Sequence, residues 1–229
     1  MCMRSKLRGA SGGHGQRPSM STHHRPAKEE MVREPQDRRE RILASAAELF
    51  ALKGVAATTV RQIADKVGIL SGSLYHHFES KEAIVDEILT AYLEDLRAQY
   101  RQIPPRDADP RTRLQYLVLA SLQVVEAYPH ATEIYQNDAN YLRQYERFGY
   151  LRNVAREVQN VWVDVINAGI DQGVFRADLD PRVFYRLVRD GLWMSVRWFR
   201  PSRDYPLTRL ADDCASIFLD GLTARGAER

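Results

Sequence analysis

Apolar residues recur at helical spacing through most of the chain, and no stretch alternates as a half-buried β-strand would. Proline residues and N-cap residues divide this pattern into segments. The predicted helices run from about Asp37 to Gly54, Thr59 to Gly68, Ser71 past Phe78, Ser80 to Ile103, Pro110 to Pro129, after Pro129 through Tyr141, Glu146 to Gln172, Pro181 to Arg200, and Leu207 to Thr223. The pattern therefore predicts an all-α fold.

The stretch TTVRQIADKVGILSGSLYHHFESK predicts two short helices around a tight turn. Thr59 is the expected N-cap of the first helix and Ser71 that of the second. Ala64, Gly68 and Leu74 supply a small contact, a left-handed corner and an apolar plug at the spacing of a helix-turn-helix. Such a unit can place its second helix in the major groove of DNA.

The outward side of this unit carries short hydrogen-bond donors, rings and cations. The candidate DNA-binding residues are Thr59, Arg61, Ser71, Gly72, Ser73, Tyr75, His76, His77 and Lys81. We expect Ser71 to Ser73 near base edges, and Tyr75 and Lys81 at phosphates. Ser80 is the predicted N-cap of the next helix. A lysine in that helix's first turn opposes the dipole, so a phosphate partner explains Lys81 better than helix stability does.

The segments TTVRQIADKVG and SGSLYHHFESKEAIVDEIL resemble the N-terminal domain of TetR-type transcriptional repressors, over roughly Arg38 to Leu96. The resemblance implies an all-helical dimer with a three-helix helix-turn-helix domain and a C-terminal domain for ligand binding and dimerisation. We accordingly expect a DNA-binding domain at 37–98 and the second domain at 99–225.

Charge and composition refine this picture only slightly. The net charge is +3, but residues 1–36 hold seven Lys/Arg against three Glu, so the remainder is near neutral. This first segment, rich in Gly, Ser, Pro, His and Arg, is expected to be a disordered basic tail. No signal peptide, membrane helix, disulfide framework or metal site is indicated, and we expect a cytoplasmic protein without a cofactor.

The predicted helix from Pro181 to Arg200 has two unlike sides. One carries arginines around a tryptophan, and its candidate ligand-binding residues are Arg186, Arg189, Trp193 and Arg197. Guanidinium groups suit phosphates and an indole suits stacking, although a charged stripe is also typical of a solvated face. The other side and the last helix predict a dimer interface made of Val188, Gly191, Ser195, Trp198, Cys214, Ile217, Phe218 and Gly221.

The stretches WVDVINAGIDQGVFRADLD and YRLVRDGLWMSVRWFRP are similar to one TetR-type subgroup, the actinobacterial repressors of cholesterol ring degradation. That resemblance implies release from a palindromic operator by a coenzyme A thioester of a steroid fragment. A fatty acyl-CoA or another hydrophobic effector remains the alternative. An enzyme acting on acyl-CoA is disfavoured, because no Ser, Cys or carboxylate is spaced to serve His76 or His77.

Overall fold

The computed structural model describes residues 27–223, with side-chain detail from Asp37 onward. The chain divides after Gln36 into two units, and the architecture below is that of the second unit. Every named element among the described residues is helical, and a single bridge between Phe175 and Thr223 forms no strand. The prediction of an all-α fold is confirmed.

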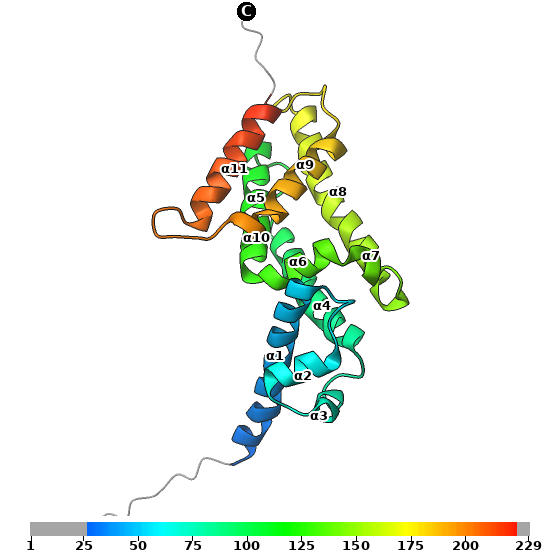
Figure 1. The fold of residues 1–229 in the computed structure, drawn as a ribbon. Coiled ribbons are helices and arrows are strands. Elements are labelled where there is room, and N and C mark those ends of the chain that lie inside the picture. Colours follow the sequence, from blue (N-terminus) through cyan, green and yellow to red (C-terminus); the bar gives the residue numbers. More distant parts are fainter. Residues whose placement is uncertain (1–26, 224–229) are drawn as a thin grey trace, which may run out of the picture. The chain divides into compact units, whose positions relative to one another are not determined.

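Figure 1 shows the helices in chain order. They are α1 (Ala27–Lys53), α2 (Val60–Val67), α3 (Ser71–Tyr75), α4 (Lys81–Tyr100), α5 (Pro110–Ala127), α6 (Pro129–Asn137), α7 (Ala139–Leu142), the 3₁₀ turn η1 (Glu146–Phe148), α8 (Tyr150–Asp171), α9 (Pro181–Trp193), α10 (Ser195–Trp198) and α11 (Leu207–Leu222).

Several boundaries differ from the expected ones. Helix α3 ends at Tyr75 and not past Phe78, and the helix predicted after Pro129 is divided at Asp138 into α6 and α7. Helix α1 begins at Ala27, ten residues before Asp37, because this stretch contains good helix formers although it lacks an apolar stripe. The 3₁₀ turn at Glu146 precedes α8, which starts at Tyr150. The predicted helix from Pro181 to Arg200 is interrupted at Met194. Residues 1–26, with Cys2 and most of the predicted tail, lie outside the described residues, as do 224–229.

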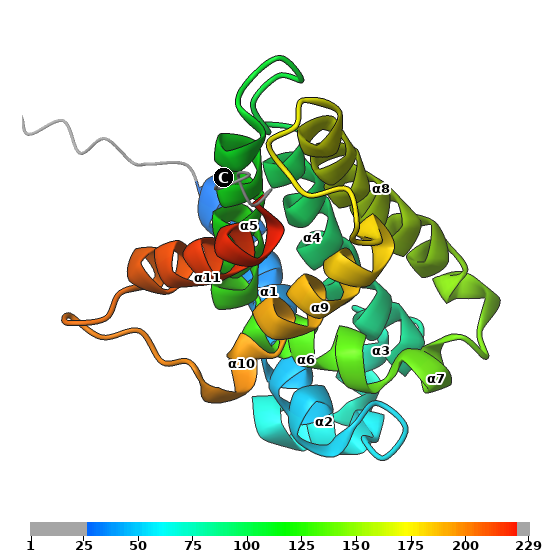
Figure 2. The same cartoon turned by 90° about the horizontal axis from the view of Figure 1, so that it is seen from above.

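Helix α5 is the centre of the C-terminal bundle. It packs against α4, α8, α9 and α11, and Figure 2 shows α11 crossing in front of it. Asp109 caps α5 and Pro110 occupies its first turn, as predicted. Leu114, Leu117 and Leu122 of α5 are fully buried or nearly so, which makes this helix part of the hydrophobic core.

A chain of buried hydrogen bonds crosses the same core. The Trp162 Nε1–H donates to the Tyr100 hydroxyl at 2.9 Å, and Tyr100 lies 2.6 Å from Ser121 Oγ. Ser121 donates to the Leu117 carbonyl at 2.7 Å, so Tyr100 must be the donor to Ser121. Each polar group in this chain is paired, which removes the cost of burying it.

Helix α8 ends at a close contact that only glycine permits. A Cβ atom on Gly169 would lie 2.0 Å from the Phe175 ring, which is itself buried. The next turn then needs a left-handed residue, and Gly173 supplies it with φ of 68°. These two glycines fix how the chain leaves α8 for α9.

Candidate functional sites

The first helix of the helix-turn-helix unit, α2, has the caps that the sequence predicts. The Thr59 hydroxyl accepts from the Gln62 N–H, and the Gln62 side chain accepts from the Thr59 N–H, which completes a capping box. Gly68 then adopts φ of 78° and donates its N–H to the Ala64 carbonyl at 2.9 Å. Leu74 and Phe78 are buried, so the predicted apolar plug is confirmed.

The second helix differs in its cap. Leu70, not Ser71, is the N-cap of α3, and no side chain bonds the first turn. The Ser71 hydroxyl is therefore not used as a cap, because the helix starts at Ser71 itself. Gly72, Tyr75 and His76 are exposed, whereas Ser71, Ser73 and His77 are partly buried. Thr59 and Arg61, at the start of α2, are also exposed.

Lys81 has a structural role that the sequence did not indicate. Its Nζ donates to the carbonyls of Val55 at 2.7 Å and Thr58 at 3.1 Å, in the connection between α1 and α2. These bonds offset the unfavourable position of the charge at a helix N-terminus. These bonds give Lys81 a structural reason besides the expected phosphate partner, and contact with DNA stays a prediction.

Arg39 is a second residue that sequence reasoning missed. Its guanidinium donates to the His77 carbonyl at 2.6 Å, pairs with Glu87, and lies 4.1 Å from the centre of the Phe78 ring. Arg39 therefore joins α1 to the end of α3 and to α4. The arginine-rich start of α1 gave no signal that set this residue apart.

A pocket of about 840 Å³ lies among α4, α6, α8 and α9. Its size is ordinary for a small-molecule site. Its apolar wall is made of Tyr92, Leu93, Leu96, Tyr135, Val154, Val158, Tyr185, Trp193 and Met194. Four arginines with exposed side chains, Arg143, Arg152, Arg156 and Arg189, also line it. The pocket thus combines an apolar and aromatic interior with cationic groups that remain accessible.

The predicted ligand residues divide into two pairs. Arg189 and Trp193 both line the pocket, whereas Arg186 and Arg197 do not. Arg197 instead donates to the Asn137 side chain at 2.6 Å. Trp193 is only 6% exposed and donates its Nε1–H to the Tyr92 hydroxyl at 2.7 Å. Trp193 thus belongs to the buried wall of the pocket and not to a solvated helix face.

The pocket arginines that follow α7 and lie on α8 were not predicted. Arg152 and Arg156 stand four residues apart on α8 and flank the buried Val154. That spacing places them on one side of the helix, which was the available signal. It carried little weight alone, since exposed arginines at this spacing are common on solvated helix faces.

The pocket raises the pKa of its tyrosines. Burial raises the pKa of Tyr185 to about 12, although the nearby Arg189 guanidinium acts in the opposite direction. Burial also raises the pKa of Tyr92 and of Tyr135. A raised pKa makes these phenols unsuited to act as bases. The accessible cationic groups of the pocket are its arginines.

Asp138 connects the pocket segment to the helix-turn-helix region. Its side chain is 9% exposed, and Oδ1 accepts the Val55 N–H at 3.0 Å. The same peptide segment is held by Lys81 through the Val55 carbonyl. Gln136 and Ala139, on either side of Asp138, line the pocket. A ligand that moves this segment can therefore act on the connection between α1 and α2.

The predicted dimer face is only partly accessible. Val188 and Ser195 are 1% and 2% exposed, so both belong to the protomer core and are removed from the predicted interface. Ser195 donates to the Leu192 carbonyl at the break after α9. Gly191 is exposed, and a Cβ there would still lie 3.9 Å from the Phe218 ring. Of the other predicted interface residues, Trp198, Ile217 and Gly221 are exposed. Cys214 and Phe218 are partly buried.

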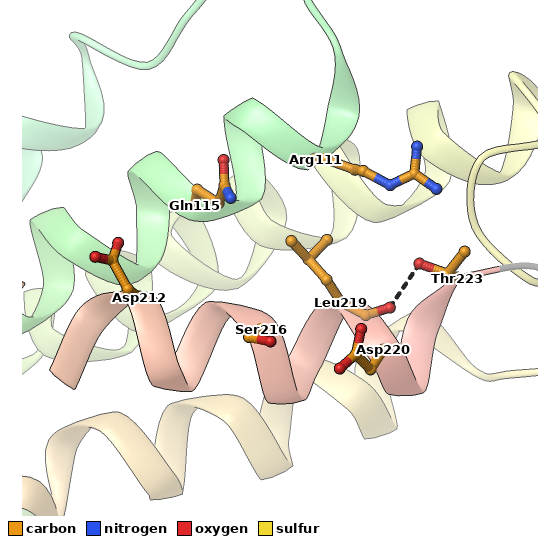
Figure 3. Close-up of a pocket in the computed structure, with 7 residues that line it drawn as sticks. All are labelled: Arg111, Gln115, Asp212, Ser216, Leu219, Asp220 and Thr223. Atoms are coloured by element: carbon orange, nitrogen blue, oxygen red, sulfur yellow. Dashed lines mark hydrogen bonds between the residues drawn. The ribbon is translucent and has the colours of Figure 1, made fainter. Parts of the chain in front are cut away.

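A second hollow, of about 740 Å³, lies between α5 and α11 (Figure 3). Arg111 and Gln115 of α5 face Asp212, Ser216 and Asp220 of α11 across it. Leu219 is its only large apolar side chain, so it cannot enclose an apolar ligand. No cluster suited to a metal ion and no helix able to cross a membrane occurs in the described part of the chain.

Comparison with known proteins agrees with this architecture. Residues 42–88 match the model for bacterial regulatory proteins of the tetR family, and residues 107–222 match the tetracyclin repressor-like C-terminal domain. The HTH-type transcriptional repressor KstR2 of Mycobacterium tuberculosis is 46% identical over 189 residues, covering 82% of this chain and 94% of the relative. KstR2 of Rhodococcus jostii is 46% identical over 187 residues, with 82% and 92% covered.

A solved structure of the ketosteroid transcriptional regulator KstR2 of Mycobacterium tuberculosis has a TM-score of 0.77 and 45% identity, and the match covers 82% of this chain and 96% of that one. These relatives are transcriptional repressors and not enzymes, as the sequence led us to expect. Two family matches and a relative of such identity leave one conclusion: the chain belongs to the TetR family of transcriptional repressors.

Proposed function

We propose that this repressor controls genes of steroid-ring catabolism and leaves its operator when a coenzyme A thioester of a steroid fragment binds. The observation that carries the proposal is the pocket among α4, α6, α8 and α9. Its aromatic wall suits a compact ring system, and its arginines suit the phosphates of coenzyme A. The solved relative from Mycobacterium tuberculosis is named a ketosteroid transcriptional regulator, which supports the same class of ligand.

The proposed repressor acts in the cytoplasm as a homodimer on a palindromic operator. Two copies of α3 would enter successive major grooves, whose centres lie roughly 34–36 Å apart in B-DNA. A ligand that displaces the segment from Tyr135 to Arg143 would loosen the bond between Asp138 and Val55. The spacing of the two α3 helices would then no longer match the half-sites, and affinity for DNA would fall.

The test compares Arg189→Ala with Arg186→Ala. Both arginines are exposed residues of α9, three positions apart, but only Arg189 lines the pocket. A charge-assisted hydrogen bond contributes about 1.5–3 kcal/mol, so Arg189→Ala should weaken ligand binding roughly 10- to 100-fold. Arg186→Ala should bind as the wild type does. The probe is a coenzyme A thioester of a bicyclic ring acid, titrated by calorimetry.

Release from DNA gives the functional readout. The protein can select its own site from a random DNA pool, and fluorescence anisotropy then follows release as the thioester is added. Arg189→Ala should stay on DNA at concentrations that release the wild type and Arg186→Ala. If both variants release DNA like the wild type, the pocket is not the effector site. If a straight-chain fatty acyl-CoA releases the wild type better than the ring thioester, the steroid assignment is wrong.

A further inference from the structure

Gln136 is the residue of the pocket whose polar atoms are unpaired. It lies in the last turn of α6 and is one of the residues that line the pocket. Both amide atoms, Oε1 and Nε2, are buried and have no hydrogen-bond partner. Among the described residues, the only other buried side-chain atom in this condition is Nη1 of Arg113. Leaving both ends of a buried amide unpaired costs free energy that an apolar side chain would not.

Three polar side chains of the pocket or next to Gln136 have partners within the protein. Trp193 donates to the Tyr92 hydroxyl, Arg189 pairs with Asp190, and the adjacent Asn137 accepts from Arg197. No residue of the pocket forms a hydrogen bond with the Gln136 amide. Nor does the helix require it, because a leucine or methionine would complete the apolar wall of the pocket and leave nothing unpaired.

We propose that Gln136 determines ligand specificity, by pairing with a ligand group that donates and accepts hydrogen bonds at once. A carboxamide presents an N–H₂ donor and a carbonyl acceptor. A ketone or a carboxylate would satisfy only the donor, whereas a hydroxyl or a secondary amide satisfies both. Within the proposed ligand class this group is either a hydroxyl on the ring system or an amide of the pantetheine arm.

This inference rests on the proposed function, since it needs a coenzyme A thioester in this pocket. It adds that the protein distinguishes ring thioesters by one polar group. A site whose buried polar group is left unpaired rejects a ligand that lacks the matching group much more strongly than an apolar pocket rejects a missing methylene. Gln136 also lies two residues before Asp138, so its partner would engage the segment that holds Val55.

The test measures binding of two thioesters of the same bicyclic acid, with and without a ring hydroxyl, to wild type, Gln136→Leu and Gln136→Met. Gln159→Leu is the matched control, because Gln159 also lines the pocket but its amide is not among the buried unpaired groups. If the ring hydroxyl is the partner, wild type prefers the hydroxylated thioester by about tenfold or more and both Gln136 variants lose the preference. If the pantetheine amide is the partner, both variants weaken the two thioesters equally.

Thermal unfolding without ligand separates recognition from support of the fold. Removing an unpaired buried amide should leave the melting temperature of Gln136→Leu or Gln136→Met unchanged or raised. Weaker binding together with a lowered melting temperature in both variants means a structural role and overturns the inference. Unchanged binding of both thioesters overturns it as well, while the proposed function stands. A wild type that binds neither thioester overturns the proposed function, and this inference with it.

Discussion

Asp138 lies between the pocket segment and the connection between α1 and α2, and its pKa depends on this position. Burial raises its pKa above the ordinary value, while the Val55 N–H bond and the Lys81 charge act in the opposite direction. The folded protein therefore holds this proton more tightly than the unfolded chain does. The group's contribution to the free energy of unfolding is complete below the unfolded pKa, about 3.9, and is lost as the pH rises through the folded pKa.

The Asp138→Asn variant tests this dependence. Asparagine keeps an oxygen for the Val55 N–H but cannot ionise. We expect the stability of the wild type, relative to Asp138→Asn, to be greatest near pH 4 and to decrease toward neutral pH in urea denaturation. Asp107→Asn, at an exposed position, is the control and should follow the wild type at each pH. A wild type that gains stability over Asp138→Asn as the pH rises would contradict the assignment.

Trp193 marks where prediction from sequence succeeds and where it fails at the residue scale. Its place in an arginine stripe correctly pointed to the pocket, because a large ring is rarely left on a solvated helix face. Its burial against Tyr92 could not be foreseen, since the partner lies 101 residues away. Gln136 escaped notice for the same reason, as only the assembled pocket shows that its amide has no partner.

At the scale of the elements, local signals decided what could be predicted. Thr59, Gly68, Ser80 and Asp109 act within a few residues of themselves, and each was correctly placed at a helix end. The break at Met194 was not predicted, because it involves neither proline nor glycine. The exclusion of Ser195 from the dimer face follows from that break, which turns the Ser195 hydroxyl onto the Leu192 carbonyl.

Variants of Tyr75 and Lys81 distinguish DNA binding from stability in the helix-turn-helix unit. Both are predicted to position phosphates, but Tyr75 is 55% exposed whereas Lys81 holds the connection between α1 and α2. Tyr75→Ala should weaken binding to operator and random DNA alike without lowering stability. Lys81→Ala should weaken both kinds of DNA and also destabilise the fold by about 1–3 kcal/mol, because buried carbonyls lose their donor.

Anisotropy with specific and random DNA, together with urea denaturation, measures these effects. Equal loss on the two DNAs supports phosphate contact. A variant that changes sequence preference while keeping its overall affinity contradicts the role given to that residue.

At the scale of the whole molecule, long-range contacts join α4 to α8 and α9. Its Tyr92 pairs with Trp193 of α9, and its Tyr100 pairs with Trp162 of α8. The rod-like helix was predicted from its length, but its partners were not. Helical periodicity shows which face of a helix is apolar, and it does not show which other helix covers that face. For this reason the fold class was predictable and the pocket was not.

The surface of α9 and α11 leads to the last prediction. Leu187 is 70% exposed, Val183 is 53% exposed and Ile217 is 68% exposed. The two helices meet where Phe184 packs edge-on against Phe218, so these side chains belong to adjacent helices. Exposed apolar side chains gathered on adjacent helices are typical of an interface between subunits. We expect this surface to be buried in the proposed homodimer.

Leu187→Asp should therefore shift the protein from dimer to monomer, because a carboxylate would have to be buried unpaired between the subunits. Leu52→Asp is the matched control, since Leu52 of α1 is also 76% exposed but does not lie on α9 or α11. Sedimentation velocity should show a monomer for Leu187→Asp and a dimer for the control. The monomer should also bind the selected operator much more weakly, since one reading head cannot hold both half-sites. A dimer that persists in Leu187→Asp and dissociates in Leu52→Asp would move the interface to α1.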